Sequence, residues 1–172
     1  MSFESLKSDI ILKQINDYNF GDKLVTVDED KISVLVFQLG DLFFAFCGSQ
    51  AREILPYTKI TWIPGANALI PGVINVRGDV AAVLDLKSIL DINEPGRGRE
   101  GGFFVMVREG DGRNGILVDN IVDIIELPES ENLPVLPTLD ERFKRFAASQ
   151  FEYRKRMVIV LDAALIIDRT RL

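Results

Sequence analysis

The chain has 172 residues, a net charge of −6 and 47% apolar residues. Its length suggests one domain or two very small ones, and its apolar content argues against general disorder. The acidic balance argues against nucleic-acid binding through the whole surface. The chain has no histidine and a single cysteine, Cys47, which excludes a catalytic triad, a His/Cys zinc site and an intramolecular disulfide.

The N-terminal stretch has the spacing of one helical face. Apolar side chains recur at Phe3, Leu6, Ile10, Ile11, Ile15 and Tyr18, and Gly21 could end the helix. The start is not basic-then-apolar, and no apolar run approaches ~18 residues, so we predict neither a signal peptide nor membrane insertion. We expect residues 1–30 to form an N-terminal extension, either a docking helix or a frayed tail, on a cytoplasmic protein.

Two β-hairpins are predicted from runs of β-branched and aromatic residues. The runs 32–39 and 42–46 flank Gly40-Asp41, which suits a two-residue turn. The runs 103–107 and 116–118 are joined by the polar segment 108–115. Short strands broken by glycine and asparagine are typical of small sandwiches or barrels.

A third pair of short strands is predicted around residues 72–80, where Arg77 stands in an apolar run. If this run is a half-buried strand, an unpaired arginine there would be costly. We therefore expect Arg77 to have an acidic partner or to lie at an edge. Glu53, on a predicted amphipathic turn at 49–55, is the nearest candidate. A guanidinium fixed in this way would also be a pre-organised contact for a partner protein.

The chain also repeats itself. Val83-Leu84-Asp85 recurs as Val160-Leu161-Asp162, which places Arg77 opposite Arg154, and the order of hairpins and prolines recurs as well. We infer two similar β units, roughly 32–91 and 102–168. Each is near the size at which a core of its own is marginal, so the two should share an apolar seam. Asp85 and Asp162 are interpreted as N-caps of short helices that follow their strands.

Three polar segments have structural interpretations. Residues 96–101 match G-x-G-x-x-G, but they precede a strand instead of following one, so we predict a surface loop and not a phosphate site. Residues 138–141 could be a capping box, and the repeat predicts that 146–153 pair with 156–161; both hold if one helical turn precedes the hairpin. Six basic residues could form a patch for an acidic partner or a membrane surface, although a solvated rim is favoured: Arg142, Lys144, Arg145, Arg154, Lys155 and Arg156.

Three motifs in the same order resemble those of the CheW family, the adaptors of bacterial chemotaxis. The run 51–86 is similar to the family's E-I-like turn, proline-containing strand, G-x-x-N-x-R-G and Asp-Leu. The matching residues are Glu53, Ile54, Pro64, Gly72, Asn75, Arg77, Gly78, Asp85 and Leu86. The run 115–123 resembles G-I-x-V-D-x-V-x-D, and 156–162 resembles the closing strand. The resemblance covers about residues 32–168.

The resemblance implies an all-β fold for a single domain over residues 31–172. In this fold two five-stranded SH3-like β-barrels pack on a shared hydrophobic seam, with short helices, and exchange of strands between the barrels is left open. It also implies a non-enzymatic adaptor that couples methyl-accepting chemotaxis receptors to a CheA-type histidine kinase. The kinase regulatory domain would bind one barrel surface, and the receptor tip would bind a groove between the barrels. Such adaptors work in arrays under the inner membrane and use no cofactor or metal.

The resemblance also implies roles for individual residues. Glu53 and Arg77 would lie on the receptor-proximal part of the first unit, and Ala51 and Val122 would line the groove. Gly72, Asn75 and Gly78 would shape the hairpin.

Two alternatives stay open at this point. One is a CheW-like scaffold of a non-flagellar chemosensory pathway. The other is a β-barrel enzyme or small-molecule binder that uses Asp85, Asp119 or Asp162, for which paired carboxylates with perturbed pKa values are expected in a pocket. A CheA kinase would need a phosphohistidine domain and a CheV adaptor a receiver domain, so a free-standing adaptor is preferred.

Overall fold

The computed structural model describes residues 29–92 and 101–171. The predicted helix within residues 1–20 and most of the glycine motif at 96–101 lie outside this part of the chain. The strands are β1 (Lys31–Leu39), β2 (Leu42–Cys47), β3 (Ala51–Pro56), β4 (Thr61–Trp62), β5 (Gly72–Val76), β6 (Asp79–Asp85), β7 (Phe103–Glu109), β8 (Gly112–Val118), β9 (Asn120–Pro128), β10 (Ala147–Tyr153) and β11 (Arg156–Leu161). The helices are α2 (Leu86–Ile89), α3 (Glu141–Lys144) and α4 (Ala163–Thr170), with a 3-10 turn at Glu129–Glu131.

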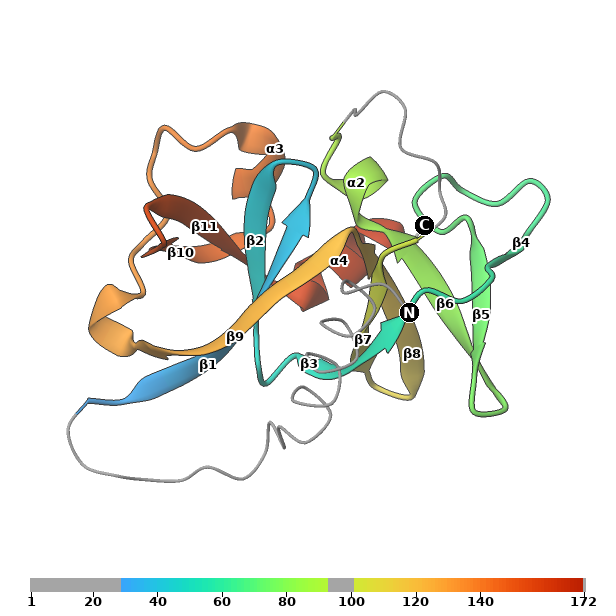
Figure 1. Cartoon of the computed structure of the whole chain (residues 1–172). Coiled ribbons are helices and arrows are strands. Elements are labelled where there is room, and N and C mark those ends of the chain that lie inside the picture. Colours follow the sequence, from blue (N-terminus) through green and yellow to red (C-terminus); the bar gives the residue numbers. More distant parts are fainter. Residues whose placement is uncertain (1–28, 93–100, 172) are drawn as a thin grey trace.

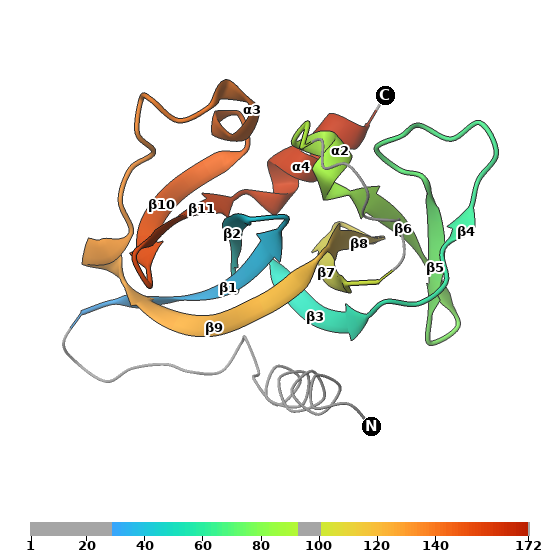
Figure 2. The ribbon, with the colours of Figure 1, turned by 45° about the horizontal axis from the view of Figure 1, so that its top comes forward.

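The strands form two sheets (Figure 1). One has five strands in the order β10-β11-β2-β1-β9, and the other has six in the order β3-β7-β8-β6-β5-β4. Figure 2 shows the two sheets side by side, with α2 and α4 at the line where they meet. The fold is therefore mostly β with short helices, as expected.

Both sheets are built in the same way. In the five-stranded sheet, β11 of one hairpin pairs in parallel with β2 of another, and β9 pairs with β1. In the six-stranded sheet, β6 of one hairpin pairs in parallel with β8 of another, and β3 pairs with β7. The short β4 adds to the free edge of β5. The repeat that the sequence indicates is thus visible in the topology.

The sheets do not follow the predicted units 32–91 and 102–168. The hairpin β1/β2 pairs with strands from the second half of the chain, and the hairpin β7/β8 pairs with strands from the first. The strand exchange that the resemblance left open is therefore present. In the described residues neither strand order closes on itself, so a pair of closed five-stranded barrels is not confirmed.

The core has one large cluster between the sheets and a smaller one within each. The large cluster takes Phe37 and Phe44 from the five-stranded sheet and Ile54 and Ile116 from the six-stranded sheet, all fully buried. A second cluster lies in the five-stranded sheet and a third in the six-stranded sheet. Because each sheet alone encloses few apolar side chains, the shared cluster supplies the seam that the small size of each unit requires.

The predicted hairpins form, with one difference in strand length. The turn between β1 and β2 is Gly40-Asp41, as predicted. Between β7 and β8, however, the turn is only Gly110-Asp111 instead of the whole segment 108–115. Polar residues such as Arg108 and Arg113 continue the ladder as an opposed pair on the exposed part of the hairpin, where a strand needs no apolar pattern.

The helices are short and begin at side-chain caps. The Asp85 carboxylate accepts from the Ser88 amide at the start of α2, and the Asp162 carboxylate accepts from the Ala164 amide at the start of α4. The single turn α3 precedes β10, and its cap is Asp140 instead of the start of the predicted capping box. No helix in the described residues is long and apolar enough to cross a membrane.

Candidate functional site

Arg77 lies in the two-residue turn between β5 and β6. The backbone φ is 53° at Arg77 and 88° at Gly78, which is the left-handed pair that a type I′ hairpin turn requires. The Asn75 side-chain oxygen accepts a hydrogen bond of 2.9 Å from the Gly78 amide and so fixes this turn. The expectation that Arg77 lies within a half-buried strand is wrong. Its side chain is 73% exposed, because the turn carries it beyond the apolar pairs of the hairpin.

Glu53 is the acidic partner of Arg77. It lies on strand β3 and not on a turn, and its carboxylate accepts from both Nη1 and Nη2 of Arg77, the first at 3.1 Å. The hydrogen bond with Glu53 and then its charge raise the pKa of the Arg77 guanidinium. The guanidinium therefore stays charged at physiological pH, and the two-nitrogen contact with Glu53 holds it in one orientation.

This ion pair also joins distant parts of the six-stranded sheet. Three strands, β7, β8 and β6, separate β3 from β5 in the sheet order. Contact between Glu53 and Arg77 therefore requires the sheet to curl until its edge strand β3 approaches the tip of the β5/β6 hairpin. The Arg77 side chain is thus oriented by the curvature of the sheet.

The pair lies in a cleft of about 370 Å³, which we call the Arg77 cleft. Its lining residues are Arg52, Glu53, Val76, Arg77, Met106, Val107, Arg108 and Arg113. Arg113 is paired with Asp79 at 2.5 Å, and Arg108 donates to the Gly110 carbonyl at 3.3 Å. The cleft thus combines a cationic rim with an apolar floor from Val76, Val107 and Met106, although the chain as a whole is acidic. This combination suits recognition of a protein segment with acidic and apolar side chains.

The comparisons with known proteins agree with this architecture. The family model described as "CheW-like domain" matches residues 33–171. The chain belongs to the CheW-like family. Among curated proteins, "Chemotaxis protein CheW" of Thermotoga maritima is 25% identical over 138 residues, which is 80% of this chain and 89% of that protein. "Protein PilI" of Pseudomonas aeruginosa is 26% identical over 129 residues, 75% of this chain and 72% of that protein.

A solved structure supports the same fold. The chain resembles the scaffolding protein TtCheW from Thermoanaerobacter tengcongensis with a TM-score of 0.67 and 24% identity, over 77% of this chain and 90% of that one. Members of the CheW-like family are scaffold or adaptor proteins and not enzymes.

The two predicted groove residues have different environments in this CheW-like domain. Ala51 is fully buried in the core cluster between the sheets, so its methyl group does not line an open groove. Val122 lies on β9, half-buried against the core of the five-stranded sheet. Presentation of Val122 to a partner stays a prediction.

Gly72, which is predicted to shape the hairpin, lies at the end of β5 away from the hairpin turn. It pairs with Trp62 of β4, and a Cβ atom at this position would overlap the carbonyl oxygen of Thr61. The glycine is therefore needed for the close approach of β4, whereas Asn75 and Gly78 form the turn.

The three aspartates of the enzyme alternative make structural bonds. Asp85 and Asp162 cap α2 and α4. Asp119 accepts from the Gly40 amide at 2.7 Å and lies 2.8 Å from Lys87 of α2, so it ties the two sheets together. No group of three or more acidic or cysteine side chains suited to a metal ion occurs in the described residues. These three carboxylates are thus used in two helix caps and in a tie between the sheets.

The six basic residues between 142 and 156 do not form one patch. Arg142, Lys144 and Arg145 belong to α3 and its end, whereas Arg154, Lys155 and Arg156 lie at the other end of the seven-residue strand β10. Several have local partners: Arg142 binds Asp140, Lys144 binds Glu141 at 3.1 Å, and Arg156 stacks on Phe43.

Sequence reasoning missed the arginines that surround the Glu53–Arg77 pair. Arg52 lies next to Glu53 at a register shift in the pairing of β3 with β7, and such bulges re-aim a side chain. Arg108 and Arg113 oppose each other near the tip of the β7/β8 hairpin. Only the pairing of β3 with β7 brings these residues to the cleft, and no local pattern indicates that pairing.

Proposed function

We propose that this protein is a non-enzymatic adaptor that couples methyl-accepting chemotaxis receptors to a CheA-type histidine kinase. The observation that carries the proposal is the match of residues 33–171 to the CheW-like family. The relative from Thermotoga maritima, named a chemotaxis protein, supports the pathway. As partners we infer the regulatory domain of the kinase and the cytoplasmic tip of the receptor, on SH3-like barrel surfaces and in the groove between them. The protein would work in the cytoplasm, in receptor arrays at the inner membrane.

The Arg77 cleft is the surface that we assign to a protein partner. A bidentate arginine–carboxylate pair leaves the outer face of the guanidinium exposed while its orientation is fixed, so little side-chain entropy is lost on binding. Arginine is enriched among interface residues that contribute most to affinity. We infer that the cleft contacts the receptor side of the assembly, and that Val122 belongs to the neighbouring groove.

A second candidate keeps the scaffold role and changes the pathway. The relative named Protein PilI is 26% identical to the chain, close to the 25% of the CheW relative from Thermotoga maritima. The chain could therefore serve a non-flagellar chemosensory pathway with its own receptor and kinase. A small-molecule-binding β-barrel without partner proteins is the least favoured alternative.

Reconstitution tests the proposal. Receptor-bearing membranes and the CheA-type kinase of the same organism are mixed with and without this protein, and autophosphorylation is followed with labelled ATP. We expect a large rise in kinase activity that depends on this protein and falls when the receptor ligand is added. No rise, together with no binding to the regulatory domain of the kinase, would refute the coupling role. A rise only with the receptor and kinase of another chemosensory operon would favour the second candidate.

A further inference from the structure

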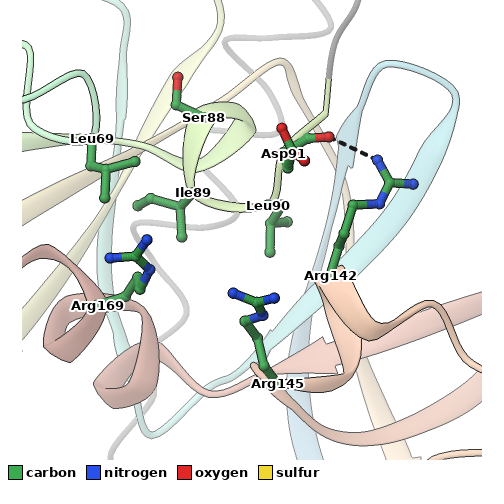
Figure 3. A pocket seen from close by; sticks show the side chains of 8 residues that line it. All are labelled: Leu69, Ser88, Ile89, Leu90, Asp91, Arg142, Arg145 and Arg169. Atoms are coloured by element: carbon green, nitrogen blue, oxygen red, sulfur yellow. Dashed lines mark hydrogen bonds between the residues drawn. The ribbon is translucent and has the colours of Figure 1, made fainter.

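A separate cavity lies where the two sheets meet, between α2 on one side and the helices α3 and α4 on the other. It has a volume of about 260 Å³. Its lining residues are Leu69, Ser88, Ile89, Leu90, Asp91, Arg142, Arg145 and Arg169. Figure 3 shows the guanidinium groups of Arg145 and Arg169 pointing into this space from one side, toward Ile89 and Leu90 on the other. We call it the three-arginine cavity.

The first of its arginines is held rigidly. Arg142 donates from Nε and Nη2 to the Asp140 carboxylate at 3.0 and 2.8 Å, and from Nη1 to the Asp91 carbonyl at 2.8 Å. The hydrogen bond with Asp140 raises the pKa of Arg142, and in return Arg142 lowers the pKa of Asp140. The bond to Asp91 joins α3 to the residues that follow α2, and so fixes one wall of the cavity (Figure 3).

The other two arginines are held less firmly than Arg142. Arg145 has one long hydrogen bond, 3.5 Å from Nε to the Glu141 carbonyl. Within residues 29–92 and 101–171, neither Arg145 nor Arg169 forms an ion pair with a carboxylate. Among the lining residues Asp91 is the one with an acidic side chain. Two guanidinium groups that face the same small space repel each other, and a bound anion would relieve that repulsion.

The cavity therefore has the features of a site for a small anion. Arginine binds phosphate and carboxylate oxygens through paired N–H donors, and such charge-assisted hydrogen bonds are stronger than neutral ones. The opposite wall is apolar, with Ile89 and Leu90 buried and Leu69 half-buried. The volume lies just below the ~300 Å³ at which pockets for drug-sized ligands begin, which suits a small metabolite.

We propose that the three-arginine cavity binds a small phosphate-bearing anion between the two halves of the protein. A phosphate group offers several acceptor oxygens on a tetrahedral centre, which matches guanidinium groups that approach from α3 and α4 together. The overall charge of −6 repels anions at long range, so binding here depends on the local arginines. The walls come from α2, which follows a strand of the six-stranded sheet, and from α3 and α4, which adjoin strands of the five-stranded sheet. An anion bound between them therefore stabilises one arrangement of the two sheets.

Calorimetry and thermal unfolding of the full chain test this site. Inorganic phosphate and pyrophosphate serve as probes, each titrated at constant ionic strength with chloride as the reference salt. We expect saturable binding, tighter for pyrophosphate, and a Tm that rises with its concentration. Arg145→Gln and Arg169→Gln should each weaken pyrophosphate binding by about fivefold or more, because each removes a charge-assisted donor.

The matched control is Arg171→Gln. Arg171 lies two residues beyond Arg169, is paired with Asp168 at 3.3 Å and does not line the cavity, so the variant loses the same charge from the same end of α4. We expect it to change affinity by less than about twofold. Equal weakening in Arg171→Gln would mean a general charge effect and would overturn the site. Absence of saturable binding of either probe would also overturn it. So would binding of a glutamate-rich peptide without binding of pyrophosphate, since that outcome assigns the arginines to an acidic protein segment.

Discussion

Arg154 occupies in the five-stranded sheet the place that Arg77 occupies in the six-stranded sheet. Each is the first residue of a two-residue hairpin turn, with φ of 48° and 53°. Each also faces a carboxylate on the edge strand at the other end of its sheet, Glu53 on β3 and Asp123 on β9. The duplicated fold therefore has an arginine–carboxylate pair at equivalent positions of its two sheets, and both of these pairs depend on the curl of a sheet.

The two pairs differ in how tightly they hold the arginine. Arg77 binds Glu53 through two nitrogens, whereas Arg154 Nη2 lies 3.9 Å from the Asp123 carboxylate. Asp123 instead accepts a hydrogen bond of 2.6 Å from the Tyr153 hydroxyl, and Arg154 stacks on the Tyr153 ring at 4.9 Å. Arg77 is thus the more rigid of two equivalent contacts, which is why we assign the partner surface to it.

Charge reversal at this position tests the assignment. Arg77→Glu should abolish receptor–kinase coupling and weaken receptor binding by about tenfold or more, as loss of a central interface arginine does. Arg154→Glu makes the same change in the same turn geometry and should keep coupling within about twofold. Pull-down with receptor-bearing membranes and kinase autophosphorylation are the measurements. If Arg77→Glu couples normally, Arg77 is not at the partner surface.

Exchange of the two charges separates the ion pair from the contact. In the double variant Glu53→Arg/Arg77→Glu the pair can form again with its direction reversed. Recovery of coupling would mean that the pair acts by holding the curled sheet. Continued loss of coupling, with unchanged circular dichroism, would mean that the partner reads the guanidinium itself.

Local signals in the sequence predict the first hairpin and two of the helix caps. Gly40-Asp41 between two apolar runs predicts the first hairpin because a two-residue turn sets its own register. Asp85 and Asp162 cap helices because each follows a buried strand and precedes amphipathic residues. The Glu53–Arg77 pair was expected for a reason that is wrong, since Arg77 is exposed; the two residues meet because the sheet curls.

The sheets themselves could not be predicted in this way. Their membership depends on the parallel pairings of β6 with β8 and of β11 with β2, which join segments far apart in the chain. Strand patterns are the same whichever hairpin lies alongside, so nothing local distinguishes the exchanged arrangement from two separate units. The cationic rim of the Arg77 cleft and the three-arginine cavity are hidden for the same reason.

Gly72→Ala should destabilise the protein. The added methyl group would overlap the Thr61 carbonyl and the Ile60 side chain, so β4 would have to move away from β5. Such overpacking costs about 1–3 kcal/mol of the free energy of unfolding. Gly78→Ala is the comparison, because the φ of 88° makes any side chain there strained while a Cβ meets no atom within 4 Å, so its cost comes from the backbone and not from overlap. Urea denaturation measures both. Similar stability of Gly72→Ala and the wild type would show that β4 does not pack as closely as described.

Removal of the Asp162 cap should lower stability without removing function. The Asp162 carboxylate accepts from the Ala164 amide and from the Gln50 side chain, both at 2.9 Å. Asp162→Ala should cost about 1–2 kcal/mol of the free energy of unfolding, and Asp162→Asn much less because asparagine is an equally good N-cap. Chemical denaturation compares the two. Loss of coupling in a folded Asp162→Asn would contradict a purely structural role for this carboxylate.

The hydrogen bond between Tyr153 and Asp123 should make stability depend on alkaline pH. Partial burial, then the hydrogen bond to Asp123, raises the pKa of Tyr153 to about 12 from an ordinary value of 10.0. Folding therefore favours the neutral phenol. This stabilisation is fully present below the unfolded pKa of 10.0 and is lost as the pH rises through about 12.

Denaturation at a series of alkaline pH values tests this linkage. The free energy of unfolding of the wild type should fall between about pH 10 and 12 more steeply than that of Tyr153→Phe, which has no phenol to ionise. The difference in ultraviolet tyrosinate absorbance between the two proteins gives the pKa of Tyr153 directly. A value near 10 in that difference titration would show that Tyr153 does not donate to Asp123 in solution. Asp123 would then be available to bind Arg154 as closely as Glu53 binds Arg77.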